Sequence, residues 1–128
     1  MNKYLLDTHI LLWWLTDDPR LSQKIREVLC DPKNIIFVSV VSAWEISIKL
    51  NLNSKFEMSV ELEECFSKEL GFKNLAIQLK HVFVLNNLKK IHQDPFDRML
   101  VSQAISEDLT FISVDEKVSR YSEVNLLN

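Results

Sequence analysis

Four acidic residues stand just beyond a predicted strand or near the start of a predicted helix. They are Asp7, Glu45, Asp97 and Asp115. Carboxylate oxygens are the ligands that hard divalent cations such as Mg²⁺ and Mn²⁺ prefer. A cation of this kind makes its bound water more acidic and polarises a phosphoryl oxygen. If the four acids meet, the chemistry they suggest is metal-dependent hydrolysis of a phosphodiester.

Three of these acids also have an ordinary structural interpretation. Asp7 and Asp115 each follow an apolar run directly, where a short carboxylate can cap the next helix. Glu45 lies three residues after Ser42, which is the spacing of a capping box. If the helix instead begins after Ser39, Glu45 lies inside it on an apolar face. A carboxylate there is costly to bury unless it is paired or coordinated, which favours a functional role.

The fourth acid belongs to a helix start. In the run from Asp94 to Asp97, Asp94 is expected to be the cap and Pro95 the first helical residue. Asp97 then aligns with Val101 and Ala104 on a face that looks inward. Its alternative role is that of an acidic first-turn residue favoured by the helix dipole.

The elements that position these acids alternate between strand and helix, which predicts a parallel sheet covered on both faces. The predicted strands are Lys3–Leu6, Ile35–Val38, Leu75–Ile77, Thr110–Val114 and Val124–Leu127. The predicted helices cover about Ile10–Leu15, Leu21–Leu29, Ser39–Leu52, Val60–Leu70, Val82–Leu85, Asp94–Ala104 and Glu116–Tyr121. Ligands bind beyond the carboxyl ends of such strands, so we expect the four acids at one edge of the sheet. Without a cation, carboxylates that crowd together repel, and some stay protonated.

Length and charge limit the function classes. A chain of 128 residues with 47% hydrophobic residues fits one domain spanning 1–128. A net charge of −3 argues against coating nucleic acid by bulk attraction, but not against an enzyme that holds phosphates through a cation. Cys30 and Cys65 form no close pair, so a disulfide scaffold or zinc site is not expected, and a reducing cytoplasm fits better. The apolar N-terminal stretch is interrupted by Asp7, Thr8 and His9, which argues against an export signal or a membrane span.

Four stretches of the chain resemble the PIN-domain nucleases, and specifically the VapC-like toxins of prokaryotic toxin–antitoxin pairs. These stretches occur in the family's order and are Leu6–Trp13, Ser39–Lys49, His92–Ala104 and Phe111–Asp115. The resemblance implies a three-layer α/β/α sandwich around a parallel sheet and a Mg²⁺- or Mn²⁺-dependent RNA endonuclease. It also implies Asp7 and Asp97 as direct metal ligands, Glu45 as a ligand or water-positioning group, and Asp115 as the more variable fourth acid.

The same resemblance implies partners. A cognate antitoxin is expected to wrap the toxin and block it, the toxin to form a homodimer, and promoter DNA to be bound only through the antitoxin. Trp13, Trp14 and Trp44 occur in apolar helical patterns, which favours a place in the core or at a dimer interface over base stacking.

Several polar residues are secondary candidates. Arg98 could hold a phosphate or pair with a nearby acid, while Ser113 and Thr8 are candidates for contacts with the substrate or with the acids. Ser113 stands where many relatives have threonine, which keeps the hydroxyl. His9 and His92 could contact RNA or support a carboxylate, but general burial habits favour packing or a surface position for both.

Two rival functions fit the sequence less well. The first is an inactive PIN-like fold that only binds antitoxin or RNA; the presence of all four acids argues against it. The second is a response-regulator receiver domain, which needs an acidic pair just after the first strand and a lysine after the fifth. Here Asp17 and Asp18 fall beyond the first helix, and no lysine directly follows the strand of Phe111.

Overall fold

The computed structural model describes residues 2–52 and 71–128, and within them it forms a five-stranded parallel sheet. The strands are β1 (Lys3–Leu6), β2 (Ile35–Ser39), β3 (Lys73–Leu75), β4 (Thr110–Ile112) and β5 (Asn125–Leu127). Their order in the sheet is β3-β2-β1-β4-β5, and every neighbouring pair is parallel. The chain therefore leaves the central strand β1 towards β2 and β3, then crosses to β4 and β5. This reversal makes a topological switch point between β1 and β4, where ligands bind in open α/β sheets.

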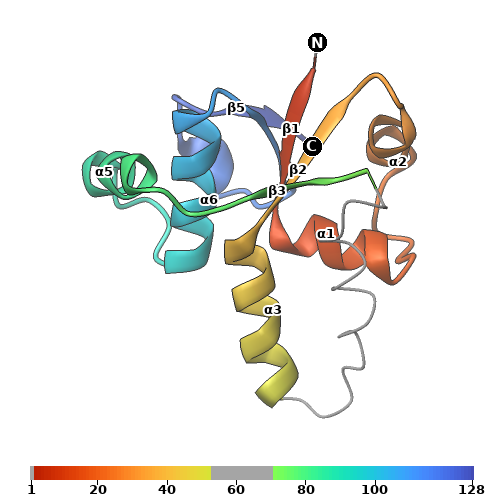
Figure 1. Ribbon diagram of the computed structural model, residues 1–128, viewed down its shortest axis with the longest axis horizontal. Coiled ribbons are helices and arrows are strands. Elements are labelled where there is room, and N and C mark those ends of the chain that lie inside the picture. Colours follow the sequence, from red (N-terminus) through yellow and green to blue (C-terminus); the bar gives the residue numbers. More distant parts are fainter. Residues whose placement is uncertain (1, 53–70) are drawn as a thin grey trace.

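The helices lie on both faces of the sheet. They are α1 (Thr8–Leu15), α2 (Gln23–Cys30), α3 (Val40–Leu52), α5 (Leu79–Asn87), α6 (Pro95–Ser106) and a short 3₁₀ turn, η2 (Val118–Arg120). Figure 1 shows α1 and α2 on one side of the strands, α5 and α6 on the other, and α3 projecting from the end of β2. The three-layer α/β/α sandwich expected from the sequence is confirmed.

Two apolar cores explain the layers. Because side chains alternate along a strand, neighbouring residues of β1 face opposite ways. Leu5 joins Phe111, Leu100 and other residues beneath α6, and Leu6 joins a second core that includes Ile10 and Ile25 of α1 and α2. Burying apolar side chains on both faces fixes the register of the sheet and therefore the place where each strand ends.

Most predicted elements are found, with shifted ends. Lys3–Leu6 is confirmed as a strand, but α1 begins at Thr8, two residues before the predicted Ile10. The third strand is Lys73–Leu75 and shares only Leu75 with the prediction. The predicted strand Thr110–Val114 ends at Ile112, and the helix expected over Glu116–Tyr121 is reduced to η2. The predicted helix Val60–Leu70 lies outside the described residues.

No helix in residues 2–52 or 71–128 is long and apolar enough to cross a membrane.

Candidate metal centre at the carboxyl ends of the strands

Asp7 follows β1 and sits at the switch point. Its backbone N–H donates to the carbonyl of Ile112, the last residue of β4, at 3.0 Å. Asp7 occupies the N-cap position of α1, yet its side chain makes no capping hydrogen bond. Instead Oδ2 accepts a 2.6 Å hydrogen bond from the Ser113 hydroxyl, and the residue is only 2% exposed. The capping interpretation of this carboxylate is therefore wrong.

The electrostatics of Asp7 follow from its burial. Burial raises the pKa of Asp7 above its usual value, while the Ser113 hydroxyl and nearby His9, through its charge and backbone N–H, partly lower it. The negative charge of Asp115 adds a further upward contribution. Ser113 links these two acids directly, because its hydroxyl also accepts the backbone N–H of Asp115 at 3.1 Å.

Asp97 lies in the first turn of α6, 9% exposed, and faces three other acids. Burial first, and then the negative charges of Asp7, Asp94 and Glu45, raise the pKa of Asp97 to about 7, against a smaller lowering by His92. The negative charges of Asp7 and Glu45 thus both act on Asp97. Elements far apart in sequence bring together a cluster of acids, Asp7, Glu45, Asp97 and Asp115, which we call the acidic crevice.

Asp115 is the more exposed member and is well supplied with donors. Oδ2 lies 2.7 Å from Nε2 of His92, and Oδ1 accepts the backbone N–H of Lys117 at 2.9 Å. Partial burial alone would raise its pKa, but the hydrogen bonds from His92 and Lys117 outweigh that effect and lower it. The His92 Nε2 atom is also 3.1 Å from Oδ2 of Asp97. Asp97 and Asp115 are therefore joined through one imidazole.

Glu45 lies inside α3, five residues after its first residue, Val40. The capping box with Ser42 is therefore wrong, because Ser42 is itself a helical residue; Ser39 accepts the backbone N–H of Val41 at the helix start instead. Glu45 is 5% exposed, and Oε2 lies 3.4 Å from Nζ of Lys49, one turn further on. A single partly exposed lysine compensates for only part of the cost of this buried charge.

Two carboxylate oxygens in the crevice have no partner. Within residues 2–52 and 71–128, the buried side-chain atoms that lack any hydrogen bond are Oδ1 of Asp7 and Oε1 of Glu45. Buried polar atoms are normally satisfied, and an unsatisfied one calls for a bound ion or water. Both are hard oxygen donors, and together with Asp97 they form the donor set that Mg²⁺ or Mn²⁺ prefers. The residues present therefore fit a divalent cation.

A second group of possible ligand residues, among those that the structure describes, includes His92. Ligand atoms of His92, Asp97 and Asp115 lie within 4.8 Å of one another. Asp7 and Glu45 are not part of that group. Because Mg²⁺ usually takes one or two carboxylates directly and keeps several waters, a cation in the crevice does not need all four acids as direct ligands.

Two buried hydroxyls connect the helix starts around the crevice. Thr8, the first residue of α1, and Ser42 of α3 share a 2.9 Å hydrogen bond between their hydroxyls, and both are fully buried. Ser113 holds Asp7, as described above. The candidates Thr8 and Ser113 thus lie beside the acids: Thr8 ties the start of α1, next to Asp7, to α3, and Ser113 binds the Asp7 carboxylate.

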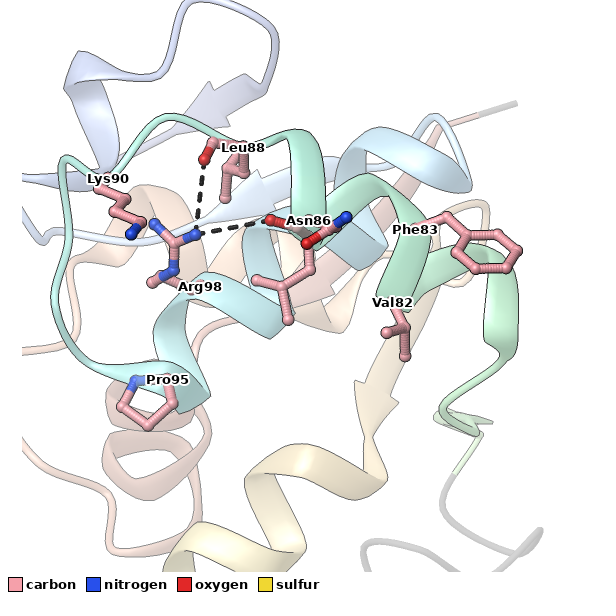
Figure 2. Close-up of a pocket in the computed structure, with 8 residues that line it drawn as sticks. Val82, Phe83, Asn86, Leu88, Lys90, Pro95 and Arg98 are labelled. Carbon is pink, nitrogen blue, oxygen red and sulfur yellow. Dashed lines mark hydrogen bonds between the residues drawn. The ribbon is translucent and has the colours of Figure 1, made fainter.

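Arg98 lies away from the acids. Its guanidinium donates to the carbonyl of Lys89 at 3.0 Å and, at 3.5 Å each, to those of Leu85, Leu88 and His92. Figure 2 shows it in the wall of a surface pocket formed by α5 and the start of α6, reaching the Leu88 carbonyl. None of the four acids lines this pocket. Among the described residues Arg98 makes no ion pair, and its hydrogen bonds to the carbonyls of Lys89 and His92 fasten the loop that carries His92.

His92 is buried, as the sequence favoured, and it also takes the less favoured role of supporting a carboxylate, while His9 is exposed beside the Trp13 ring. His92 is 7% exposed and supports carboxylates. The available signal was its position two residues before a capping Asp-Pro pair, where a side chain is turned back towards the helix start.

These features define the chain as a parallel α/β protein with an acidic crevice at the switch point of its sheet. The model of the PIN domain family matches residues 4–124, and the chain belongs to this family. No curated protein sequence is significantly similar to the chain.

Several solved structures share the fold. They include VapBC2 from Rickettsia felis bound to a DNA fragment from its promoter, with 20% identity and a TM-score of 0.77, covering 98% of both chains. DNA-bound VapBC from Salmonella typhimurium is 17% identical with a TM-score of 0.77, covering 99% of this chain and 98% of that one. VapBC-1 from nontypeable Haemophilus influenzae is 17% identical with a TM-score of 0.73, covering 98% and 97%. At these identities the likeness concerns the fold.

Proposed function

We propose that this chain is a Mg²⁺- or Mn²⁺-dependent RNA endonuclease and the toxin of a toxin–antitoxin pair. The observation that carries the proposal is the pair of buried, unpartnered carboxylate oxygens on Asp7 and Glu45, beside Asp97 in a PIN domain. Such oxygens are costly in a folded protein unless something binds them, and a divalent cation is the ligand their chemistry fits.

In this proposal each residue of the crevice has a defined task. A bound Mg²⁺ or Mn²⁺ supplies a more acidic water and neutralises charge on the phosphodiester. Asp7, Glu45 and Asp97 would hold it, and Asp115 would act at the margin, since both its oxygens already accept hydrogen bonds. The Ser113 hydroxyl fixes Oδ2 of Asp7 and leaves Oδ1 to face the crevice.

The partners belong to the same proposal. The solved structures that share the fold include VapBC complexes, and those from Rickettsia felis and Salmonella typhimurium contain DNA. We propose that a small cognate antitoxin covers this chain, that promoter DNA is bound through the antitoxin, that the whole of 1–128 acts as one domain, and that the chain works in the cytoplasm as a homodimer.

The test is an RNA cleavage assay with purified protein. Cleavage is expected with Mg²⁺ or Mn²⁺, to stop with chelator, and to fall at least about 100-fold in Asp7→Asn and Asp97→Asn, which keep the side-chain shape but remove the charge. Glu107→Gln is the control, since this carboxylate lies far from the crevice and pairs with Lys80 and His81. Wild-type cleavage by both crevice variants would refute the site. RNA binding without cleavage would indicate a binding module. In the same assay, the product of a small reading frame directly upstream should inhibit cleavage.

A further inference from the structure

We propose that His92 is a positioning residue that sets the spacing of Asp97 and Asp115 as a hydrogen-bond donor, and that it is not itself a metal ligand. This inference rests on the proposed function and concerns the same crevice. Asp97 and Asp115 come from different elements, the first turn of α6 and the loop after β4. The His92 Nε2 atom lies within 3.1 Å of both carboxylates, at 2.7 Å from Asp115 and 3.1 Å from Asp97.

The hydrogen bond on the other ring nitrogen decides which atom carries the proton. The backbone N–H of Asp94 donates to Nδ1 of His92 at 3.1 Å, so Nδ1 must offer a lone pair. A neutral imidazole has one protonated nitrogen, and the proton therefore lies on Nε2. A protonated Nε2 donates to a carboxylate and has no lone pair left for a cation. Although His92, Asp97 and Asp115 have the spacing of a three-ligand site, the imidazole acts there as a donor.

The ring is held rigidly enough for this task. His92 is 7% exposed, and its backbone N–H donates to the buried Tyr121 hydroxyl at 2.8 Å. Asp94 acts at both ends of the connection, because its N–H fixes the imidazole while its carboxylate accepts the N–H of Asp97 at 3.3 Å. Side chains that orient metal-binding groups in this way commonly govern metal affinity.

Two substitutions separate the two ring nitrogens. His92→Asn places an oxygen near the position of Nδ1 and can still accept the Asp94 N–H, but it has no donor that reaches the carboxylates. His92→Gln places an amide N–H near the position of Nε2 and keeps the donor. We expect Mn²⁺ affinity, measured by calorimetry, to fall roughly 10- to 100-fold in His92→Asn and to stay within about threefold of wild type in His92→Gln.

His81 provides a matched control. It is fully buried, its Nδ1 accepts the backbone N–H of Gln78 at 3.0 Å, and its Nε2 lies 3.0 Å from Oε1 of Glu107, but it is remote from the four acids. His81→Asn should lower the melting temperature of the metal-free protein and leave Mn²⁺ affinity unchanged. Equal losses of affinity in His81→Asn and His92→Asn would mean that only stability is involved, and would overturn the proposal.

A spectroscopic measurement on the wild-type protein does not depend on how the variants fold. In ¹⁵N-resolved imidazole spectra at slightly alkaline pH, Nε2 of His92 should carry the proton both without metal and with saturating Mg²⁺. His92 would be a ligand if it lost that proton on Mg²⁺ binding, or if His92→Gln lost as much affinity as His92→Asn. Either result would overturn the positioning role of His92 and leave the proposed function standing. A folded wild type that binds no Mn²⁺ would instead refute the proposed function, and this proposal with it.

Discussion

Asp7 occupies the N-cap position of α1, but its carboxylate turns away from the helix and towards Ser113. The protein gives up a local hydrogen bond that would stabilise α1 by about 1 kcal/mol. It also keeps one oxygen of Asp7 and one of Glu45 buried without a partner. The missing cap and the unpartnered oxygens both lower the stability of the metal-free fold, and both features are typical of a site that binds a ligand.

The pKa of Asp97 gives a prediction at this scale. In the metal-free protein it is raised to about 7, compared with about 3.9 for an unfolded chain. The folded state then binds more protons than the unfolded state between these values. Its contribution to stability is full below about pH 4 and is lost as the pH rises through about 7. Asp97→Asn should remove this loss and raise the free energy of unfolding at pH 8 by something on the order of 2 kcal/mol.

Urea unfolding in chelator at pH 5 and pH 8 measures the effect. Asp115→Asn is the control of opposite sign, because the pKa of Asp115 is lowered and its contribution is present at the higher pH and lost in acid. Saturating Mg²⁺ should remove the advantage of Asp97→Asn. If the free energy of unfolding changed with pH in Asp97→Asn as it does in wild type, the pKa of Asp97 would not be raised in the folded protein.

At the scale of elements, helix starts bring the acids together. Trp44 of α3 and Phe96 of α6 meet edge to face, with ring centroids 4.8 Å apart. Each aromatic residue directly precedes a crevice acid, Glu45 and Asp97. The packing of α3 on α6 therefore sets the distance between two carboxylates that are 52 positions apart in the sequence.

The cap of α6 can be tested separately from its charge. Asp94 Oδ1 accepts the N–H groups of Phe96 at 2.8 Å and Asp97 at 3.3 Å. Asp94→Ala should lower the free energy of unfolding by about 1 kcal/mol and weaken Mn²⁺ binding, because the first turn that carries Asp97 loosens. Asp94→Asn keeps a capping oxygen and should retain most of the stability.

Ser22→Ala is the matched control for that prediction. Ser22 caps α2 by accepting the N–H of Ile25 at 3.2 Å, far from the acids in sequence and on the other face of the sheet. It should lose similar stability in urea unfolding without any change in Mn²⁺ affinity by calorimetry. If Asp94→Ala changed stability alone, α6 would not need its cap to present Asp97.

The sequence predicts those helices and strands whose signals lie in their own residues, and it misses features that depend on contacts between distant residues. The β-branched and aromatic run of β2 and the Asp-Pro start of α6 are local signals, and both elements are found. The edge strand β3 reads Lys-Asn-Leu, which carries no strand signal and depends on pairing with β2. The four acids could be predicted as one candidate site because parallel strands share a carboxyl edge. The tautomer of His92 could not be found, since it depends on the turn that brings the Asp94 N–H onto the ring.

At the scale of the whole molecule, exposed apolar side chains form a stripe along each of two helices in the part of the chain that the structure describes. Val40, Trp44 and Ile48 are exposed along α3, and Leu79, Val82 and Phe83 along α5. Between them lies an apolar pocket lined by Val41, Trp44, Ile77, Leu85, Pro95, Phe96 and Met99. Exposed apolar surface of this extent is typical of a protein-binding face.

The proposed homodimer predicts that this face is covered, because a partner copy would remove its exposed apolar side chains from water. Trp44 and Phe83 are 59% and 60% exposed, so a change of either to Asp acts on this face, and Phe83→Asp also keeps the Trp44–Phe96 contact between α3 and α6. Each change should weaken self-association roughly tenfold or more, since a charge would be buried at the centre of the contact. Sedimentation velocity over a concentration series measures this, with Gln23→Asp on exposed α2 as the control for added charge. A wild type that stays monomeric, with antitoxin binding lost in Trp44→Asp, would assign the face to the antitoxin instead.

A partner that covers Trp44, whether a second copy or the antitoxin, should also hold α3 against α6. Because Glu45 and Asp97 lie next to the Trp44–Phe96 contact, the Mn²⁺ affinity should rise when the partner binds.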